Sequence, residues 1–378
     1  MTTMLLKNLI NNLKPNIPSP KIKGISFDSR NIKKGDLFVS IKGNTYDGND
    51  YIKQAVQKGA KAVVYSSPVK KNQKAIFIKV KNTRDTLAKL SAKYYVEKPK
   101  NMIINLIISF VVILATVTFA GLSSSDLVIQ TAWYILIIHW VTFLPALIFK
   151  TEKFYDLTGS ICYAFGSVFV YYQTYGATFS LSLFISIAVL IWTIRLGSFL
   201  LKRVLDAGED KRFRTIKKSP TQFFMTFNLS ALWVVICSLC ALTAVSNGVL
   251  AVEPIFYLGL FIFIAGFSIE VIADNQKTQF RVIPENANKF ITTGLWSASR
   301  HPNYFGEVVL WAGIAIMSLP YLQGVQYWTL ISPIFSFVLI YFVSGVRMLE
   351  ARANVKWGEN AEYQKYVKKT PVFFPKIF

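Results

Sequence analysis

The chain has 378 residues, of which 53% are hydrophobic, and its formal net charge is +22. The lysines are scattered singly, without a finger motif or an arginine-aromatic pattern, so the charge does not indicate nucleic-acid binding. The three cysteines form no CxxC pair and have no histidine at ligand spacing, so they indicate neither a disulfide framework nor a metal site.

Charge and apolar residues divide the chain into two parts. Residues 1–100 hold 21 Lys/Arg and 6 Asp/Glu, a balance of +15, whereas 101–378 hold 21 and 14 among long apolar runs. The amino terminus alternates apolar with polar residues and lacks the apolar core of a signal peptide. We therefore predict a small soluble domain over 1–100, followed by a membrane domain over 101–378.

The soluble part has an α/β pattern, because short β-rich runs alternate with turn signals over 24–64 and one stretch, 49–58, is helix-like. The motifs DSR, GDLF and DG at this spacing resemble the amino-terminal domain of Mur ligases, in particular UDP-N-acetylmuramoyl-tripeptide synthetase, over about 4–99. The resemblance implies UDP-sugar contacts at Phe27, Ser29, Asn44, Thr45 and Tyr46.

The ATP-binding GTNGKT loop of that family should follow, but the first apolar segment begins at Asn101 instead. Ligase activity is therefore excluded, because the phosphate cradle and the metal ligands are missing. Two interpretations stay open, in which the domain binds a UDP-muramoyl precursor or is an inert remnant of a gene fusion.

The second part has the pattern of an all-α, multi-pass membrane domain. A stretch of about 20 apolar residues can span a bilayer as a helix. We mark eight such segments, at roughly 102–122, 127–149, 157–172, 178–200, 223–245, 254–273, 304–320 and 327–346.

The links between these segments alternate in charge. The links 123–126, 173–177, 246–253 and 321–326 contain no Lys or Arg, whereas the other links and the carboxyl tail are basic. Since cytoplasmic loops carry the excess of Lys and Arg, we predict an even number of spans in a bacterial inner membrane, with both termini cytoplasmic.

The polar motifs gather at the cytoplasmic ends of these segments, where ionisable groups indicate a functional site. Arginine matches phosphate oxygens and carboxylates accept from ribose hydroxyls, so a nucleotide cofactor is the expected ligand. No GxGxxG or GxxxxGK[ST] motif occurs, so helices and loops of the membrane domain would have to hold it. The candidate cofactor-binding residues are Arg195, Asp274, Arg281, Arg300, His301, Asn303, Glu307 and Arg347.

Four stretches resemble bacterial membrane proteins related to the carboxyl-terminal domain of steroid 5-alpha-reductases. They are RLGSFLLKRVLDAGEDKRFR (195–214), ADNQKTQFR (273–281), TGLWSASRHPNYFGEVVLWAG (293–313) and RMLEARANVKWGENAEYQKYVKKTP (347–371). The resemblance implies that Asp274, Arg281, Asn303 and Arg347 bind NADPH, with Arg195 and Glu307 lining the site. It further implies reduction of a double bond in a lipid-soluble, steroid-like or isoprenoid-like substrate.

The chain departs from that family at the catalytic positions. The tyrosine that polarises the substrate carbonyl in the reductases is replaced by Trp192, whose indole cannot transfer a proton. Their glutamate on an early span has only Asp156 as its nearest counterpart. The catalytic candidates are therefore Asp156, Trp192, Tyr304 and Glu307.

A second family resemblance leaves an alternative open. RHPNYFGE, followed by Arg347, Glu350 and WGENAEYQKY, also resembles isoprenylcysteine carboxyl methyltransferases and phospholipid methyltransferases, which bind S-adenosylmethionine. Those enzymes carry paired glutamates where this chain has Glu350-Ala351, and the ADNQKTQFR stretch favours the reductases. The expected cofactor is thus NADPH, with S-adenosylmethionine as the alternative.

Overall fold

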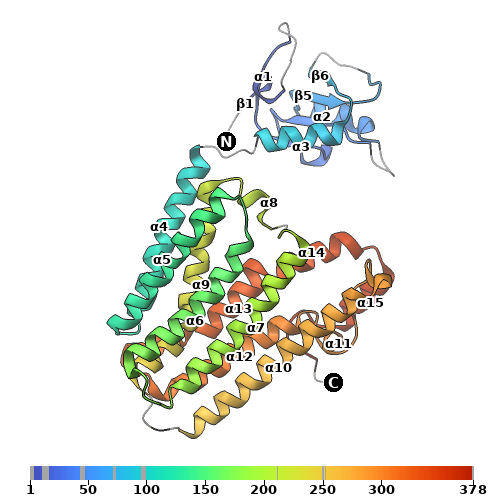
Figure 1. The fold of residues 1–378 in the computed structure, drawn as a ribbon. Coiled ribbons are helices and arrows are strands. Elements are labelled where there is room, and N and C mark those ends of the chain that lie inside the picture. The colour runs from blue at the N-terminus through green and yellow to red at the C-terminus, as the bar shows by residue number, and fades with distance from the viewer. Residues whose placement is uncertain are drawn as a thin grey trace. The chain divides into compact units, whose positions relative to one another are not determined.

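The computed structural model describes residues 4–10, 17–42, 47–70, 74–94, 99–210, 212–248, 251 and 253–376. Figure 1 shows the chain coloured from its amino terminus to its carboxyl terminus. The chain forms two compact units, Met1–Asn101 and Met102–Phe378, and each is described by itself.

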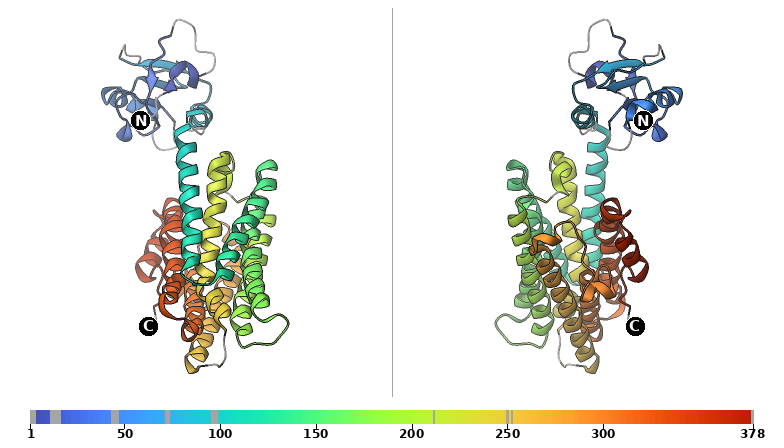
Figure 2. Two further views of the ribbon diagram at one scale, coloured as in Figure 1. Left: turned by 90° about the vertical axis from the view of Figure 1, so that its left-hand side faces the viewer. Right: turned by 90° about the vertical axis from the view of Figure 1, so that its right-hand side faces the viewer.

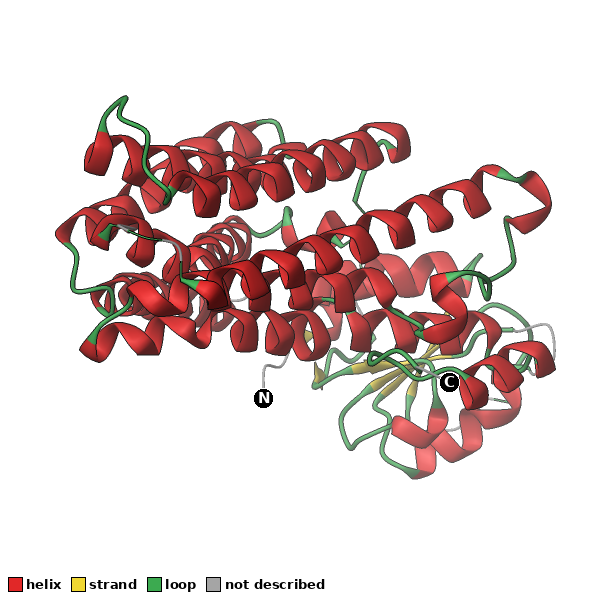
Figure 3. Cartoon of the chain, turned by 90° about the horizontal axis from the view of Figure 1, so that it is seen from below, coloured by secondary structure: helices red, strands yellow, loops and turns green. Residues whose placement is uncertain are grey.

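The first unit is built on a four-stranded parallel sheet, whose strands are yellow in Figure 3. The order is β3 (Ile25–Ser26), β4 (Leu37–Val39), β5 (Ala62–Tyr65) and β6 (Ile76–Lys79). A separate antiparallel pair joins β1 (Met4–Leu5) to β2 (Lys21–Ile22). Strands β4 and β5 are buried along their whole length, as expected for parallel strands covered on both faces.

Alternate side chains of the sheet pack against different helices. Leu37 and Val64 pack in one core with residues of α1 (Leu6–Leu9) and α3 (Thr83–Tyr94). Phe38 and Val63 pack in a second core with α2 (Ile52–Gln57). Because successive side chains of a strand point to opposite faces of the sheet, each strand contributes to both cores. The unit therefore has the predicted α/β fold.

The second unit is a bundle of long helices that run side by side in both views of Figure 2. The long helices are α4 (Pro99–Gly121), α5 (Asp126–Ile148), α6 (Lys153–Tyr175), α7 (Leu183–Ala207), α9 (Pro220–Asn247), α10 (Pro254–Val282) and α12 (Pro302–Ser318). Shorter helices are α8 (Phe213–Ile216), α11 (Leu295–Ala298), α13 (Ser332–Val338), α14 (Val346–Trp357) and α15 (Ala361–Lys369).

Among the described residues, seven helical segments are long and apolar enough to cross a membrane, where the sequence led us to predict eight. The predicted segment 157–172 is the one not among the seven. It lies in α6, which packs against α5, α7 and α9 but begins with charged residues and is interrupted by Ser, Thr, Tyr and Gln. The chain is nevertheless a multi-pass helical membrane protein.

The last segment, Gly324–Trp357, is not one continuous α-helix. It begins as a 3-10 helix over Gly324–Ile331, continues as α13, and then becomes a π-helix over Leu339–Ser344. The backbone breaks at Gly345, where α14 begins. Such π-helical turns occur frequently at functional sites, and α14 carries Arg347 and Glu350.

Helices α10 and α12 approach one another through glycines spaced seven residues apart on each helix. Gly266 faces α12 so closely that an added Cβ atom would lie 2.4 Å from the Leu310 backbone nitrogen. A Cβ atom on Gly306 would lie 2.6 Å from the Glu270 backbone nitrogen. Gly259 and Gly313 make the equivalent contact two turns further along. Small residues are what allow membrane helices to approach this closely, and here the contact fixes Glu270 against the start of α12.

Candidate functional site

A cluster of charged side chains joins α7, α10 and α12, three helices that lie next to one another in Figure 1. Arg195 of α7 donates from Nη1 to Glu270 Oε1 at 2.6 Å and from Nη2 to Asp274 Oδ2 at 2.6 Å. Trp192 donates its indole N–H to the second oxygen of Glu270 at 3.2 Å, and the Asn303 amide donates to Asp274 Oδ1 at 3.1 Å. We call these five residues the Arg195 cluster.

The Arg195 cluster is short of positive charge. Glu270 is 2% exposed and Asp274 is 5% exposed, and both depend on the single guanidinium of Arg195. Glu307, one residue after Gly306 in the α10–α12 contact, is a third buried acid at 8% exposure. In the part of the chain that the structure describes, Glu307 makes no ion pair. Three buried carboxyl groups share one ion-pairing guanidinium, and this excess of acid favours a proton on one of them, because unpaired buried charges are costly.

A second cluster lies at the start of α12, and we call it the Glu350 cluster. Glu350 of α14 accepts from Arg300 Nη1 at 2.5 Å and is joined to His301 Nε2 at 2.8 Å. Because a carboxylate accepts, Nε2 of His301 carries the hydrogen and Nδ1 is left as an acceptor. Burial lowers the pKa of His301 below its ordinary value of 6.5, while Glu350 acts in the opposite direction.

Three buried polar atoms of these two clusters have no hydrogen-bond partner among the described residues. They are Arg300 Nε, His301 Nδ1 and Asn303 Oδ1, from neighbouring positions at the start of α12. Buried polar atoms are almost always hydrogen-bonded, so unpartnered ones require an explanation. One donor and two acceptors in this place suit a ligand that carries both acceptor and hydroxyl or amide groups.

The carboxyl-terminal tail holds the segment before α12 in place. The Arg300 backbone N–H donates to the Pro371 carbonyl at 2.9 Å, and the Ser299 hydroxyl donates to the Phe373 carbonyl at 2.8 Å. On the other side, the Trp296 indole donates to the Ala273 carbonyl of α10 at 3.0 Å. The carboxyl-terminal tail is thereby hydrogen-bonded to Ser299 and Arg300, which lie more than 70 residues earlier in the sequence.

The structure brings together only part of the predicted site. Arg281 and Arg347 are exposed, and the Arg347 guanidinium lies 5.3 Å from the centre of the Phe342 ring. Neither arginine forms an ion pair within the described ranges. Tyr304 stacks on His301, with the ring centres 5.9 Å apart. Asp156 belongs to a different group of charges, since it lies 3.9 Å from Arg203 and 3.7 Å from Arg212.

Glu270 and Glu350 are central to the two clusters but were absent from the predicted site residues. A signal for Glu270 was present, because Glu270 and Asp274 are four residues apart and such residues share one face of a helix. Glu350 belongs to the sequence that resembles the methyltransferases, but its pairing with Arg300 and His301 had no local signal, since these partners are 50 and 49 residues away.

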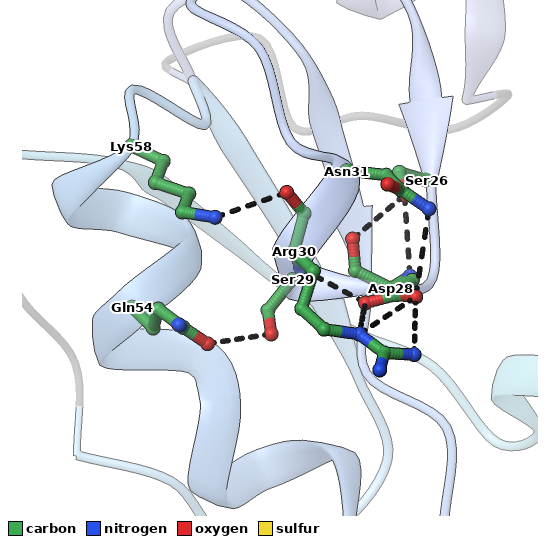
Figure 4. A network of polar contacts seen from close by, with 7 residues as sticks. All are labelled: Ser26, Asp28, Ser29, Arg30, Asn31, Gln54 and Lys58. Carbon is green, nitrogen blue, oxygen red and sulfur yellow. Dashed lines mark hydrogen bonds and ion pairs between the residues drawn. The ribbon is translucent and has the colours of Figure 1, made fainter.

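In the soluble unit, Figure 4 shows the polar network around the predicted UDP-sugar residue Ser29. The Ser29 hydroxyl donates to Gln54 Oε1 at 2.7 Å, and the Asp28 carboxylate pairs with Arg30 at 2.8 Å. Phe27 is 63% exposed and therefore free to stack on a planar group. The other predicted contacts, Asn44, Thr45 and Tyr46, lie outside the described residues.

The long apolar helices define a multi-pass integral membrane protein, in which three of the helices meet at a buried ionic cluster. The chain belongs to the DUF1295 family, described as proteins of unknown function, whose model matches residues 142–370. A second model, described as the Mur ligase family, catalytic domain, matches residues 21–95.

The curated relatives match the soluble unit. The UDP-N-acetylmuramoyl-L-alanyl-D-glutamate--2,6-diaminopimelate ligase of Clostridium tetani is 39% identical over 99 residues, which are 24% of this chain and 20% of the relative. The enzyme of that name from Bacillus licheniformis is 42% identical over 105 residues, 26% of this chain and 21% of the relative. The UDP-N-acetylmuramoyl-tripeptide--D-alanyl-D-alanine ligase of Rickettsia prowazekii is 45% identical over 67 residues, which are 18% of this chain and 15% of the relative. The chain spans about a fifth of the length of these relatives.

Proposed function

We propose that the membrane domain is an NADPH-dependent oxidoreductase that reduces a double bond of a lipid-soluble substrate. The single observation that supports this most is the unpartnered set at the start of α12, Arg300 Nε, His301 Nδ1 and Asn303 Oδ1, beside two ionic clusters. The four stretches that resemble the steroid 5-alpha-reductases contain all three residues of the Glu350 cluster, and Arg195, Asp274 and Asn303 of the Arg195 cluster. The substrate would enter from the lipid bilayer, and the site would face the cytoplasm of a bacterial inner membrane.

The residues present fit a dinucleotide. Exposed Arg281 and Arg347 are free to pair with phosphates, because neither has an acidic partner in the described residues. Asn303 Oδ1 and His301 Nδ1 can accept from an amide or a ribose hydroxyl. Arg195, in contrast, is already neutralised by Glu270 and Asp274, so its part is to hold those carboxylates in place.

NADPH would supply a hydride when bound, and the protein would supply binding, orientation and exclusion of water. Trp192 and Arg195 keep Glu270 fixed against the Gly306 backbone. Glu307 is buried and its carboxyl group makes no hydrogen bond or ion pair among the described residues, so it is the acid best placed to hold a proton for the reaction. Tyr304 lies against His301 and would close the site on the side of α14.

A methyltransferase that uses S-adenosylmethionine is the second candidate. The observation in its favour is the Glu350 cluster, in which Arg300 and His301, at the start of RHPNYFGE, contact Glu350, another residue that carries the resemblance to the methyltransferases. The soluble unit, for its part, would bind a UDP-muramoyl precursor without catalysis, through Phe27 and Ser29, or be inert.

A titration of the full-length protein in detergent tests the proposed function. We expect NADPH to bind at micromolar concentration, detected by nicotinamide fluorescence, and Arg347→Ala to weaken binding ten- to hundredfold, since one charge-assisted contact contributes about 1.5–3 kcal/mol. Arg352→Ala, which removes an exposed arginine of the same helix, should leave the affinity unchanged. Equal losses in the two variants would contradict the assignment of Arg347.

A further inference from the structure

The last helix of the chain, α15, has two chemically different faces. Tyr363 and Tyr366 form an aromatic face, and their ring centres lie 5.1 and 5.7 Å from that of Phe290. The other face carries exposed lysines at a spacing of three and four residues, which places them side by side on the helix surface. We call this the lysine face, and its members are Lys365, Lys368 and Lys369.

The lysine face is not neutralised by the chain itself. Within the described part of the chain, none of its three side chains forms an ion pair, although Glu362 precedes Lys365 by three residues. The lysines line a shallow surface depression together with Ala361 and Gln364. The surrounding stretch 347–376 holds seven Lys/Arg against three Asp/Glu. This surplus of exposed positive charge attracts an anionic partner.

The contacts of α15 and of the tail that follows it fix both beside the ends of membrane helices. The Tyr366 hydroxyl donates to the Trp296 carbonyl at 2.6 Å, in the short helix α11 that precedes α12. Beyond α15, Phe374 packs against Phe305 of α12 and Phe337 of α13, with ring centres 6.2 and 6.3 Å away. The lysine face is therefore carried by a helix that is anchored to the bundle at and after its carboxyl end.

Phe374 indicates where the tail meets the lipid. Its side chain is 67% exposed although it contacts the rings of two helices of the bundle, so its free side faces outward. Aromatic rings in this position are typical of the boundary between acyl chains and headgroups. Lys369 precedes Phe374 by five residues, and a fully extended chain of that length spans about 18 Å. The lysine face is therefore held close to the membrane surface.

We propose that the lysine face of α15 binds the phosphate groups of anionic lipids at the membrane surface. Each lysine is a compact positive charge, and the attraction of several such charges to an anionic bilayer adds up. A helix with a basic face, next to an exposed apolar ring, has the composition of a helix that lies on a bilayer. A soluble acidic partner would account for the lysines but not for the exposed Phe374.

Neutralising the lysine face tests the proposal. The triple variant Lys365→Gln, Lys368→Gln, Lys369→Gln removes the charge and keeps good helix formers in α15. Full-length protein in detergent would be titrated with phosphatidylglycerol or with zwitterionic phosphatidylcholine, and the bound lipid counted by native mass spectrometry. We expect the wild type to prefer phosphatidylglycerol, less so at high salt, and the triple variant to bind it about ten- to hundredfold more weakly.

Two further triple variants serve as controls. Lys153→Gln, Lys202→Gln, Lys289→Gln removes the same charge from three exposed lysines in separate segments of the membrane domain, and should change the affinity far less. Arginine at the three positions of the lysine face keeps the positive charge and should keep the binding.

Several results would overturn the proposal. They are equal binding of the two lipids by the wild type, equal losses in the two glutamine variants, and loss of binding in the arginine variant. Polyglutamate, added as a soluble polyanion, provides a separate check. If it bound through the lysine face while phosphatidylglycerol did not, the partner would be an acidic protein and the assignment to lipid would be wrong.

Discussion

At the scale of single residues, Arg195 shows how a buried charge is divided among partners. Its two terminal nitrogens each take one carboxylate, and both of these carboxylates are more than nine-tenths buried. Removing one partner of such a pair leaves an uncompensated buried charge, which costs about 3–5 kcal/mol. Arg195 therefore positions Glu270 and Asp274, and in the proposed function the positive charge for the dinucleotide would come from Arg281 and Arg347.

His301 gives the protein a stability that depends on pH. Burial lowers its pKa in the folded protein, with Arg300 and Lys277 acting in the same direction and Glu350 opposing them. The unfolded chain then binds a proton more readily, so this contribution is fully present above pH 6.5 and is lost as the pH falls below it. We expect the unfolding temperature to fall between pH 7.5 and pH 5.5, and to fall less in His301→Gln. An equal decrease in both proteins would contradict this assignment.

At the scale of elements, the sequence alone predicts most of the fold. Apolar length and basic links locate the membrane helices, and short β-rich runs locate the parallel sheet. The structure has seven candidate membrane spans among its described residues, one fewer than predicted, because α6 is too polar in composition. Its packing against α5, α7 and α9 nevertheless makes α6 part of the bundle.

Pairings between distant segments could not be predicted, because each depends on the packing of helices far apart in the chain. Glu350 meeting Arg300 is one example, and the tail running past Ser299 is another. The heptad spacing of Gly259, Gly266, Gly306 and Gly313 was visible in the sequence, but only the structure reveals that the two pairs face one another.

The glycine contact between α10 and α12 should be sensitive to a single methyl group. Gly266→Ala places a Cβ atom 2.4 Å from the Leu310 backbone nitrogen, so the helices must separate, at a cost of about 1–3 kcal/mol. Gly159→Ala is the matched control, because its Cβ atom would meet only Ser230 Oγ at 3.6 Å. Alanine favours the helix over glycine by up to ~1 kcal/mol, so the control should be as stable as the wild type or more so. Thermal unfolding in detergent measures both, and equal stability of the two variants would refute the close contact.

At the scale of the whole molecule, a compact α/β unit and a helical membrane unit are joined in one chain. The basic links predict which ends of the helices face the cytoplasm. Cysteines introduced as Ser124→Cys or Val325→Cys should react with an impermeant maleimide from the periplasmic side, whereas Ala287→Cys and Glu359→Cys should not. The three native cysteines are buried, so we expect little maleimide labelling of the protein without introduced cysteines. Labelling of Ala287→Cys and Glu359→Cys, and not of Ser124→Cys and Val325→Cys, would show that the predicted orientation is wrong.

We propose that the membrane domain binds a dinucleotide beside the Arg195 and Glu350 clusters, around the start of α12. Native mass spectrometry of the full-length protein, incubated with equal concentrations of NADPH and S-adenosylmethionine, tests it most directly. We expect a complex that carries one NADPH, and the loss of that complex in Arg347→Ala but not in Arg352→Ala. A complex with S-adenosylmethionine alone, retained in both variants, would contradict it.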